Sequence, residues 1–255
     1  MSTPYLTVLI PCYNERENLQ RGVLDEVHDY LSRQAYSWEV IVSDDGSSDD
    51  SRELVRAAIA DKPGFRLQEN PHGGKPSALW LGLGSARGEI TLFTDMDQST
   101  PIHQVARLLP CFEQGFDAAI GSRGVERQDF VWYRRLGSAV FRALRRALLL
   151  RNISDTQCGF KAIRTPLARE VFARLEPIRN PVSVSGWRVT AFDVELLYLL
   201  ERGGHRIAEV PVEWADRDAA RGKQKSYLAE SKEMLGQILR VKRNAWRGEY
   251  DRPSR

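Results

Sequence analysis

Residues 89–97 have the sequence EITLFTDMD, in which two carboxylates follow an apolar stretch. Residues 89–93 are rich in β-branched and aromatic side chains, which is typical of a buried strand. Asp95 and Asp97 are two positions apart, so in an extended chain both side chains point the same way and can bind one hard cation. Two aspartates at this spacing often belong to a solvated turn, but the preceding strand favours a Mg²⁺ or Mn²⁺ site.

Strand-like and helix-like patterns alternate through the first 120 residues. Strands are predicted at residues 6–10, 38–42, 65–69, 89–93 and 116–120. Helices are predicted at residues 17–34, from Asp49 or Ser51 to about residue 60, at 76–86 and at 101–113. This alternation predicts βαβ units, and therefore an α/β fold in which helices cover both faces of a mostly parallel sheet.

Polar segments follow three of the predicted strands, at residues 11–15, 44–47 and 95–97. Ligands of open α/β sheets bind beyond the carboxyl ends of the strands, so these segments are expected to meet at one edge. Asp44 and Asp45 could bind a nucleobase or ribose, or they could instead cap the next helix or form an Asx turn. Lys75 follows two glycines and could contact a phosphate, but the chain has neither GxxxxGK[ST] nor a GxGxxG after the first strand.

The second half is more basic than the first. Helices are predicted at residues 132–150, 191–201 and 226–247, with strands after residue 155 and at 205–212. Arginine and lysine concentrate in residues 121–151 and 217–255, although the net charge is only +3, which indicates either an anionic partner or a solvated basic face. The helices at 132–150 and 226–247 could rest on an anionic membrane surface or pack on the core.

Cysteine usage and hydropathy limit the location of the chain. Its three cysteines are far apart and form no metal or disulfide pattern, which fits a reducing compartment. The N-terminal residues lack the features of a signal peptide, and no apolar stretch is long enough to cross a bilayer. We therefore expect a cytoplasmic protein whose membrane contact, if it has one, is peripheral.

Several strings, taken together and in order, resemble family-2 glycosyltransferases of the GT-A fold: VLIPCYNERENL, VIVSDDGSSD, GGKPSALWLGL, LFTDMDQSTP, GSR and DTQCGFKA. Within that family they are similar to polyprenyl-phosphate (dolichyl-phosphate) glycosyltransferases. The resemblance spans about residues 5–215. It implies a catalytic domain at 1–215, with a nucleotide-binding half to about 120 and an acceptor-binding half at 121–215. Residues 216–255 would form a basic helical extension.

The resemblance also implies roles for individual residues. The nucleotide site would comprise Pro11, Tyr13, Asn14, Glu15, Asp44, Asp45, Lys75 and Asp95. Asp95 and Asp97 would hold the metal. The acceptor side would comprise Arg123, Arg134 or Arg135, Gln157, Phe160 and Lys161. Asp193 and Glu195 match an acidic helix start that faces the active site. Gln98 departs from the pattern, because glucosyl relatives tend to have a small residue there.

The expected activity is the inverting, metal-dependent transfer of a hexose, from UDP-glucose rather than GDP-mannose, to a polyprenyl phosphate (EC 2.4.1 type). The catalytic residues would be Asp97, Arg123 and Asp193. A lipid phosphate is already an anion, so arginine forks need only position it. If the acceptor is instead a sugar hydroxyl, Asp193 would be the base.

Two other functions fit the sequence less well. A sugar-nucleotide pyrophosphorylase would have a glycine- and arginine-rich loop after the first strand, where this chain has PCYNERENL. A nucleic-acid-binding module is the non-enzymatic alternative, but the chain has no zinc ligands, RRM-like aromatic motif or arginine-glycine tract. We therefore expect no nucleic-acid partner.

Overall fold

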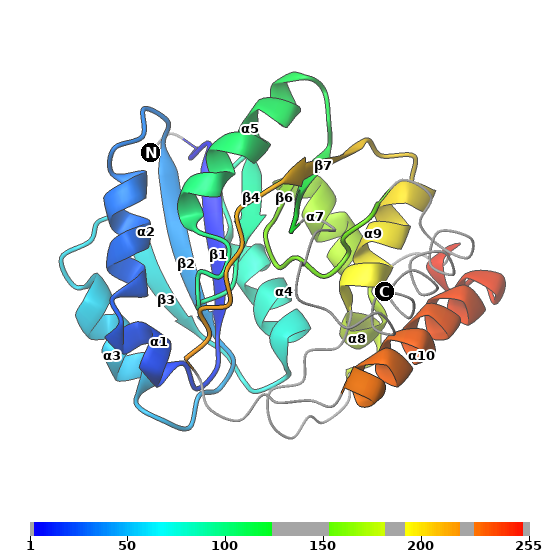
Figure 1. The fold of residues 1–255 in the computed structure, drawn as a ribbon, viewed down its shortest axis with the longest axis horizontal. Helices are drawn as coiled ribbons and strands as arrows, with labels where there is room; N and C mark the ends of the chain where they lie inside the picture. Colours follow the sequence, from blue (N-terminus) through cyan, green and yellow to red (C-terminus); the bar gives the residue numbers. More distant parts are fainter. Residues whose placement is uncertain (1–2, 124–152, 182–191, 220–226, 252–255) are drawn as a thin grey trace.

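The central sheet is built around β1 (Leu6–Cys12), a strand that is buried along its whole length. The computed structural model describes residues 3–123, 153–181, 192–219 and 227–251 (Figure 1). Its sheet has the order β3-β2-β1-β4-β6-β5-β7. The other strands are β2 (Trp38–Asp44), β3 (Phe65–Glu69), β4 (Ile90–Phe93), β5 (Ala118–Ser122), β6 (Lys161–Arg164) and β7 (Ile207–Pro211). All of the described strand pairs are parallel except those of β6, so the predicted α/β class with a mostly parallel sheet is confirmed.

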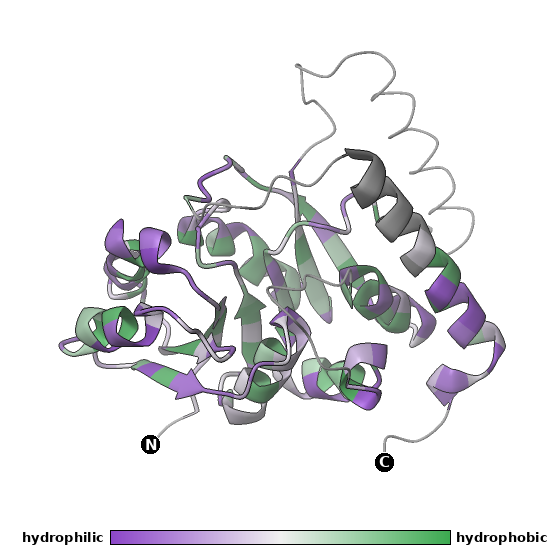
Figure 2. Ribbon diagram, turned by 90° about the horizontal axis from the view of Figure 1, so that it is seen from below, coloured by the Kyte–Doolittle hydropathy of each residue, from purple (hydrophilic) through white to green (hydrophobic). Residues whose placement is uncertain are grey.

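Helices cover both faces of the sheet. The first apolar cluster joins one face to α1 (Arg16–Gln20), α2 (Val23–Leu31), α3 (Ser51–Ile59) and α5 (Val105–Glu113). The second joins the other face to α4 (Lys75–Ser85), α7 (Thr165–Phe172) and α9 (Phe192–Arg202). Along β1, Val8 and Ile10 belong to the first cluster and Leu9 to the second, as the alternation of a strand requires. Figure 2 shows hydrophobic residues concentrated on the sheet and on the helices beside it.

Two predicted helices differ from those observed. The helix predicted at residues 17–34 is interrupted by Gly22, whose φ of 77° is incompatible with a continuous α-helix but accessible to glycine. The helix predicted at 101–113 begins as the 3₁₀ turn η1 (Ile102–Gln104) before α5. Neither α7 nor α8 (Glu176–Arg179) is predicted from the sequence, although the proline in the first turn of each is a common signal for the start of a helix.

The chain ends in α10 (Tyr227–Trp246) and η2 (Glu249–Asp251), so the predicted helix at residues 226–247 is confirmed. Ile238, Val241 and Tyr250 of this segment belong to the second apolar cluster. The helix predicted at 132–150 lies outside the described residues, as do Arg134 and Arg135. None of the described helices has the length and apolarity needed to span a bilayer. The three cysteines, Cys12, Cys111 and Cys158, are free and buried.

Candidate active site

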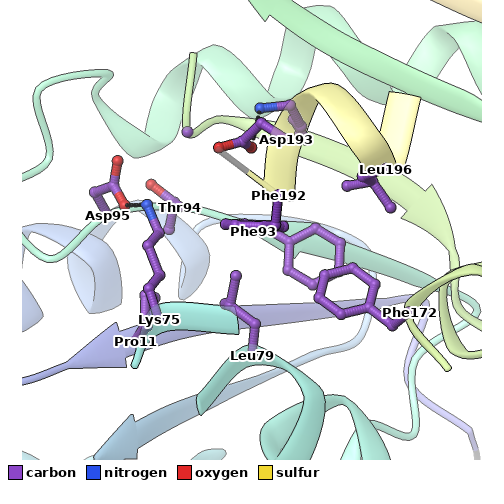
Figure 3. Close-up of a pocket in the computed structure, with 12 residues that line it drawn as sticks. Pro11, Lys75, Leu79, Phe93, Thr94, Asp95, Phe172, Phe192, Asp193 and Leu196 are labelled. Carbon is purple, nitrogen blue, oxygen red and sulfur yellow. Dashed lines mark hydrogen bonds and ion pairs between the residues drawn. The ribbon is translucent and has the colours of Figure 1, made fainter. Parts of the chain in front are cut away.

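A pocket opens at the carboxyl edge of the sheet, where β1 and β4 end and the antiparallel β6 begins (Figure 3). It brings together five of the predicted site residues: Pro11, Lys75, Asp95, Lys161 and Asp193. Behind these polar groups stands an apolar wall made of Leu79, Phe93, Phe172, Phe192 and Leu196. Segments about 180 residues apart in the sequence therefore converge on one pocket.

Lys75 forms an ion pair with Asp95 inside the pocket. Burial works against the charged form of Lys75, but the neighbouring carboxylates, Asp95 first and then Asp193, outweigh it and raise the pKa of Lys75. The side chain of Lys75 is largely buried, whereas 41% of the Asp95 side chain is exposed. Asp95 therefore keeps a face open to a ligand while Lys75 holds its other side.

Gly159 makes the position of Asp95 possible. A Cβ atom at residue 159 would collide with Oδ2 of Asp95, so the carboxylate occupies space that only glycine leaves. The DTQCGFK segment, expected on the acceptor side, thus also shapes the expected metal site. Gly159 was not predicted as a site residue, although a glycine between Cys158 and Phe160 is the signal that could have revealed this close approach.

Asp97 lies next to the pocket in a turn that Gln98 braces. Oδ1 of Asp97 accepts a hydrogen bond of 2.8 Å from the backbone N–H of Ser99. Burial, and then the charge of Asp95, raises the pKa of Asp97. Gln98 has a φ of 51°, and its Nε2 donates to the carbonyl oxygen of Asp95 at 2.9 Å. The residue that departs from the family pattern therefore holds the turn that carries both carboxylates.

Asp95 and Asp97 offer the oxygen ligands that Mg²⁺ and Mn²⁺ prefer. Among the described residues, no group of three or more His, Cys, Asp or Glu side chains is arranged to hold a metal ion. A Mg²⁺ site commonly consists of one or two carboxylates completed by substrate phosphates and water. The space that Gly159 leaves for Asp95, and the exposed face of that carboxylate, fit such a site.

Lys161 and Asp193 form a second ion pair across the pocket. Nζ of Lys161 lies 2.7 Å from Oδ1 of Asp193 and also donates to the carbonyl oxygen of Cys158. Lys161 is almost fully buried at the start of β6, whereas Asp193 stands in the first turn of α9. Both pocket lysines thus lie beside a carboxylate, and the pocket presents alternating charges above its apolar wall.

Asp44 and Asp45 are fully buried, and their carboxylates bind the protein itself. Asp44 accepts hydrogen bonds from the backbone N–H groups of Gly46 and Ser47 and from Nε of Arg52. Asp45 accepts bonds of 2.9 and 2.8 Å from the N–H groups of Gly73 and Gly74. Asp44 thus has the Asx-turn geometry considered above, while Asp45 anchors the glycine turn that precedes Lys75.

Tyr13, Asn14 and Glu15 line the loop between β1 and α1. The ring of Tyr13 stacks on His72 with centroids 4.6 Å apart. Asn14 has a φ of 52°, and its Oδ1 accepts a bond from the backbone N–H of Ser48. The backbone N–H of Glu15 donates to the hydroxyl of Ser51. These contacts join the loop to the segments after β2 and β3, and the role of the three residues in nucleotide binding stays a prediction.

Arg123 is held in place by Asp155, a residue that the sequence did not single out. Nε and Nη2 of Arg123 donate to both carboxylate oxygens of Asp155, at 2.7 and 2.9 Å. Although burial opposes ionisation, Arg123 lowers the pKa of Asp155 to about 2. The guanidinium also lies over the ring of Trp214, 5.6 Å from its centroid. Gln157 is exposed next to this pair, and its N–H donates to Asp155.

Glu195 lies away from the pocket, contrary to the expectation that it faces the active site. Its Oε1 accepts hydrogen bonds from the hydroxyl of Tyr250 at 2.8 Å and from the backbone N–H of Glu176 at 3.0 Å. Two positions separate Glu195 from Asp193, and in a helix that spacing puts the two side chains on different sides. Phe160 is likewise a buried core residue rather than part of the pocket lining.

Residues 212–219, which follow β7, lie across the turn that contains Asp97. The backbone N–H of Ala215 donates to the carbonyl oxygen of Ser99, and that of Ala219 donates to Oδ1 of Asn18. The guanidinium of Arg217 binds both carboxylate oxygens of Glu26 in α2. These contacts tie the C-terminal side of the chain to the edge of the expected nucleotide site, and no sequence signal indicated them.

The chain is similar to known proteins in both sequence and fold. Residues 7–172 match the profile of the family described as glycosyl transferase family 2. The dolichyl-phosphate beta-glucosyltransferase of Homo sapiens is 33% identical, over 98% of this chain and 80% of the relative. The enzyme of the same name from Dictyostelium discoideum is 30% identical, over 93% of this chain and 74% of the relative.

Among solved structures, glucosyl-3-phosphoglycerate synthase from Mycobacterium tuberculosis, in complex with Mn²⁺, UDP-glucose and phosphoglyceric acid, superposes with a TM-score of 0.63. The match covers 98% of this chain and 81% of the synthase at 21% sequence identity. Mannosyl-3-phosphoglycerate synthase from Rubrobacter xylanophilus gives the same TM-score at 14% identity. These likenesses concern the fold, and they confirm the GT-A prediction.

Proposed function

Because the chain belongs to glycosyltransferase family 2, we propose that it transfers a hexose from a nucleotide sugar to a polyprenyl phosphate, inverting the anomeric carbon. UDP-glucose is the favoured donor and GDP-mannose the next. Relatives named dolichyl-phosphate beta-glucosyltransferase, 30–33% identical over most of this chain, support both the glucosyl donor and the lipid acceptor.

The observation that carries the proposal is the presence of two lysines in one small pocket beside Asp95. Each ammonium group is paired with a carboxylate, so the pocket has little net charge, but each can also donate a charge-assisted hydrogen bond to a phosphate oxygen. Lys75, next to Asp95, suits the donor diphosphate, and Lys161 suits the acceptor phosphate. Since Oδ1 of Asp193 already accepts a hydrogen bond from Lys161, the pocket favours an acceptor that needs no deprotonation.

Asp95 and Asp97 would hold Mg²⁺ or Mn²⁺, which neutralises the charge that develops on the leaving diphosphate. The remaining contributions to catalysis would come from side chains that the fold holds in position. Gln98 and Gly159 fix the carboxylates, and Arg123, oriented by Asp155, presents its guanidinium near the acceptor side. Holding both reactants in line for displacement is the main catalytic effect that such a site can supply.

A sugar or other hydroxyl acceptor is the second candidate, because Asp193 lines the pocket and could then accept the proton. Asp193→Asn separates the two possibilities. With a phosphate acceptor, we expect this variant to lose much less than the ~10²–10⁴-fold that removing a general base costs.

The direct test incubates the chain with Mn²⁺ or Mg²⁺, each donor in turn and polyprenyl phosphate in detergent micelles, and measures glycolipid. We expect glucose to be transferred to the lipid, and we expect chelation of the metal to abolish this transfer. Asp97→Ala should reduce turnover by at least about 10²-fold, because the transition state would lose the metal ion that stabilises the charge on the leaving diphosphate. The matched control is Asp29→Ala, which removes a carboxylate that is 70% exposed on α2 and should leave activity unchanged. Full activity of Asp97→Ala, or no product with either donor, would refute the proposal.

A further inference from the structure

The outward side of α10 carries apolar side chains that the fold does not bury. Trp246 is 91% exposed and Leu239 is 55% exposed. They are seven positions apart, so they stand on one side of the helix. The opposite side, with Ile238 and Val241, packs into the second apolar cluster. Because the inner side already anchors the helix, packing gives no reason for Leu239 and Trp246 to be apolar.

Basic residues occupy the positions around this apolar pair. Lys242 and Arg243 lie between Leu239 and Trp246 on the same side and are exposed, as is the neighbouring Arg247. Residues 236–247 contain no aspartate or glutamate. Scattered exposed apolar residues are ordinary, but a tryptophan and a leucine interleaved with cations on one helix face are typical of helices that lie at a membrane surface.

The placement of α10 suits contact with a large, flat partner. Among the elements that the structure describes, the helix lies at the outer edge, beyond α9 (Figures 1 and 2). Glu176, the acidic residue paired with Arg240 at 3.6 Å, belongs to α8 and lies toward the body of the protein. The outward side therefore presents positive charge and a tryptophan, whose ring suits the head-group region of a bilayer.

We propose that this face of α10, defined by Leu239, Lys242, Arg243, Trp246 and Arg247, docks on a bilayer surface rich in anionic lipids. Trp246 and Leu239 would enter the head-group region, while the cations lie against lipid phosphates. The inference rests on the proposed function, because a polyprenyl-phosphate acceptor keeps its tail in the bilayer. Helix α10, which lies within the extension at residues 216–255, would then bring the pocket to that acceptor.

Vesicle co-sedimentation tests the docking without any catalysis. The full chain is mixed with phosphatidylcholine vesicles, with or without 30% phosphatidylglycerol and lacking polyprenyl phosphate. We expect binding to the anionic vesicles that weakens as salt rises, since the attraction is screened. Arg243→Gln should weaken partitioning by about fivefold, the effect of one cation near such a surface. Trp246→Glu should weaken it by roughly tenfold or more, because an interfacial anchor is replaced by an anion.

Leu81→Glu is the matched control, because Leu81 is the exposed leucine of α4 and lies outside the proposed face. It should bind vesicles like the wild type. Absence of wild-type binding to anionic vesicles, or undiminished binding by Trp246→Glu, would overturn the proposal. So would a change from dimer to monomer in Trp246→Glu without lipid, since the face would then join two copies of the chain.

Failure of docking and failure of the proposed function give different results. Trp246→Glu should keep full glycolipid synthesis in detergent micelles, where no vesicle surface is needed. Asp97→Ala should lose that synthesis and still sediment with anionic vesicles. Wild-type protein that makes glycolipid in micelles without binding vesicles would refute the docking alone.

Discussion

Lys75 is paired with Asp95, the carboxylate that we propose holds the metal ion, so the ammonium group and the ion would share one carboxylate. The same ammonium lies where a donor diphosphate would enter the pocket. We therefore expect this single residue to affect metal binding and donor binding in opposite directions.

We expect Lys75→Met to separate these two effects. Without the ammonium, Asp95 should bind Mn²⁺ in the absence of donor at least as tightly as in the wild type. kcat/KM for the nucleotide sugar should fall by about tenfold or more, which corresponds to one charge-assisted hydrogen bond. Electron paramagnetic resonance of free Mn²⁺ and steady-state kinetics measure the two quantities. Weaker Mn²⁺ binding together with unchanged donor kinetics would contradict this role for Lys75.

Gly159 permits a comparison between two glycine-to-alanine changes. Gly159→Ala should cut turnover by about 10²-fold, because displacing a catalytic group by 1 Å has an effect of that size. Gly84→Ala in α4 is the control, since a Cβ there meets no atom within 4 Å and alanine favours a helix. Thermal unfolding and glycolipid synthesis should show an active, slightly stabilised Gly84→Ala. Equal activity of both variants would mean that Asp95 does not need the space beside Gly159.

At the scale of elements, Glu39 of β2 joins four parts of the fold at the edge away from the pocket. Its carboxylate accepts hydrogen bonds from the hydroxyl of Thr7 in β1, from Arg66 in β3 and from the backbone N–H and side chain of Arg87. Burial alone would favour the neutral acid. Hydrogen bonding, from Arg66 first and then from Arg87 and Thr7, lowers the pKa of Glu39 to about 2.

Glu39 should therefore protect the fold against acid. Its pKa is lower in the folded chain than the ordinary 4.5, so its contribution is fully present above that value and disappears as pH falls toward 2. We expect the contribution to be on the order of 2 kcal/mol, since both arginine partners reach solvent. Urea unfolding between pH 2 and 6 measures it. Glu39→Gln should be less stable at pH 6 and show a flatter profile, and an unchanged profile would contradict the assignment.

The opposite pKa shift at Glu195 concerns how the C-terminal segment joins the rest of the molecule. Burial raises the pKa of Glu195 to about 7, although the hydroxyl of Tyr250 and the N–H of Glu176 favour its charged form. Because the folded value lies above the ordinary 4.5, the fold is most favoured below that value, and stability declines as pH rises toward 7.

Glu195→Gln should remove this decline, because glutamine keeps an acceptor for Tyr250 and stays neutral. The difference at pH 8 should be on the order of 2 kcal/mol in favour of the variant. Urea unfolding of both proteins at pH 5 and 8 gives the measurement, and turnover should survive because Glu195 lies outside the pocket. A variant that is less stable at both pH values would show that the charged form is the stabilising one.

Over the whole molecule, the sequence was most informative where the spacing of apolar residues alone decides the secondary structure. The β-branched stretches around Ile10, Val42 and Leu92 predict three of the parallel strands and place the acidic segments at their ends. The antiparallel insertion of β6 between β4 and β5 could not be predicted, since strand order depends on packing between distant segments. The same reason explains why Gly159, Asp155 and residues 212–219 were missed.

The direction in which a polar side chain points was the second feature that the sequence did not predict. Asp44 and Glu195 stand at positions that a motif marks as functional, yet the carboxylate of each binds backbone N–H groups of the chain itself. The sequence alone cannot distinguish a carboxylate that is available to a ligand from one that accepts hydrogen bonds from the protein backbone. The difference arises from which N–H groups the fold leaves within 3 Å of the oxygen atoms.

The buried thiols of Cys12, Cys111 and Cys158 have a practical consequence for spectroscopy. Burial raises the pKa of each, so at neutral pH they are protonated and shielded from alkylating reagents. A cysteine introduced at an exposed position would react far faster than any of them. Gly236→Cys, at an exposed position of α10 where a Cβ atom meets no other atom within 4 Å, would therefore accept one nitroxide or environment-sensitive dye, and the depth of a single helix position in a bilayer could be measured without first building a cysteine-free protein.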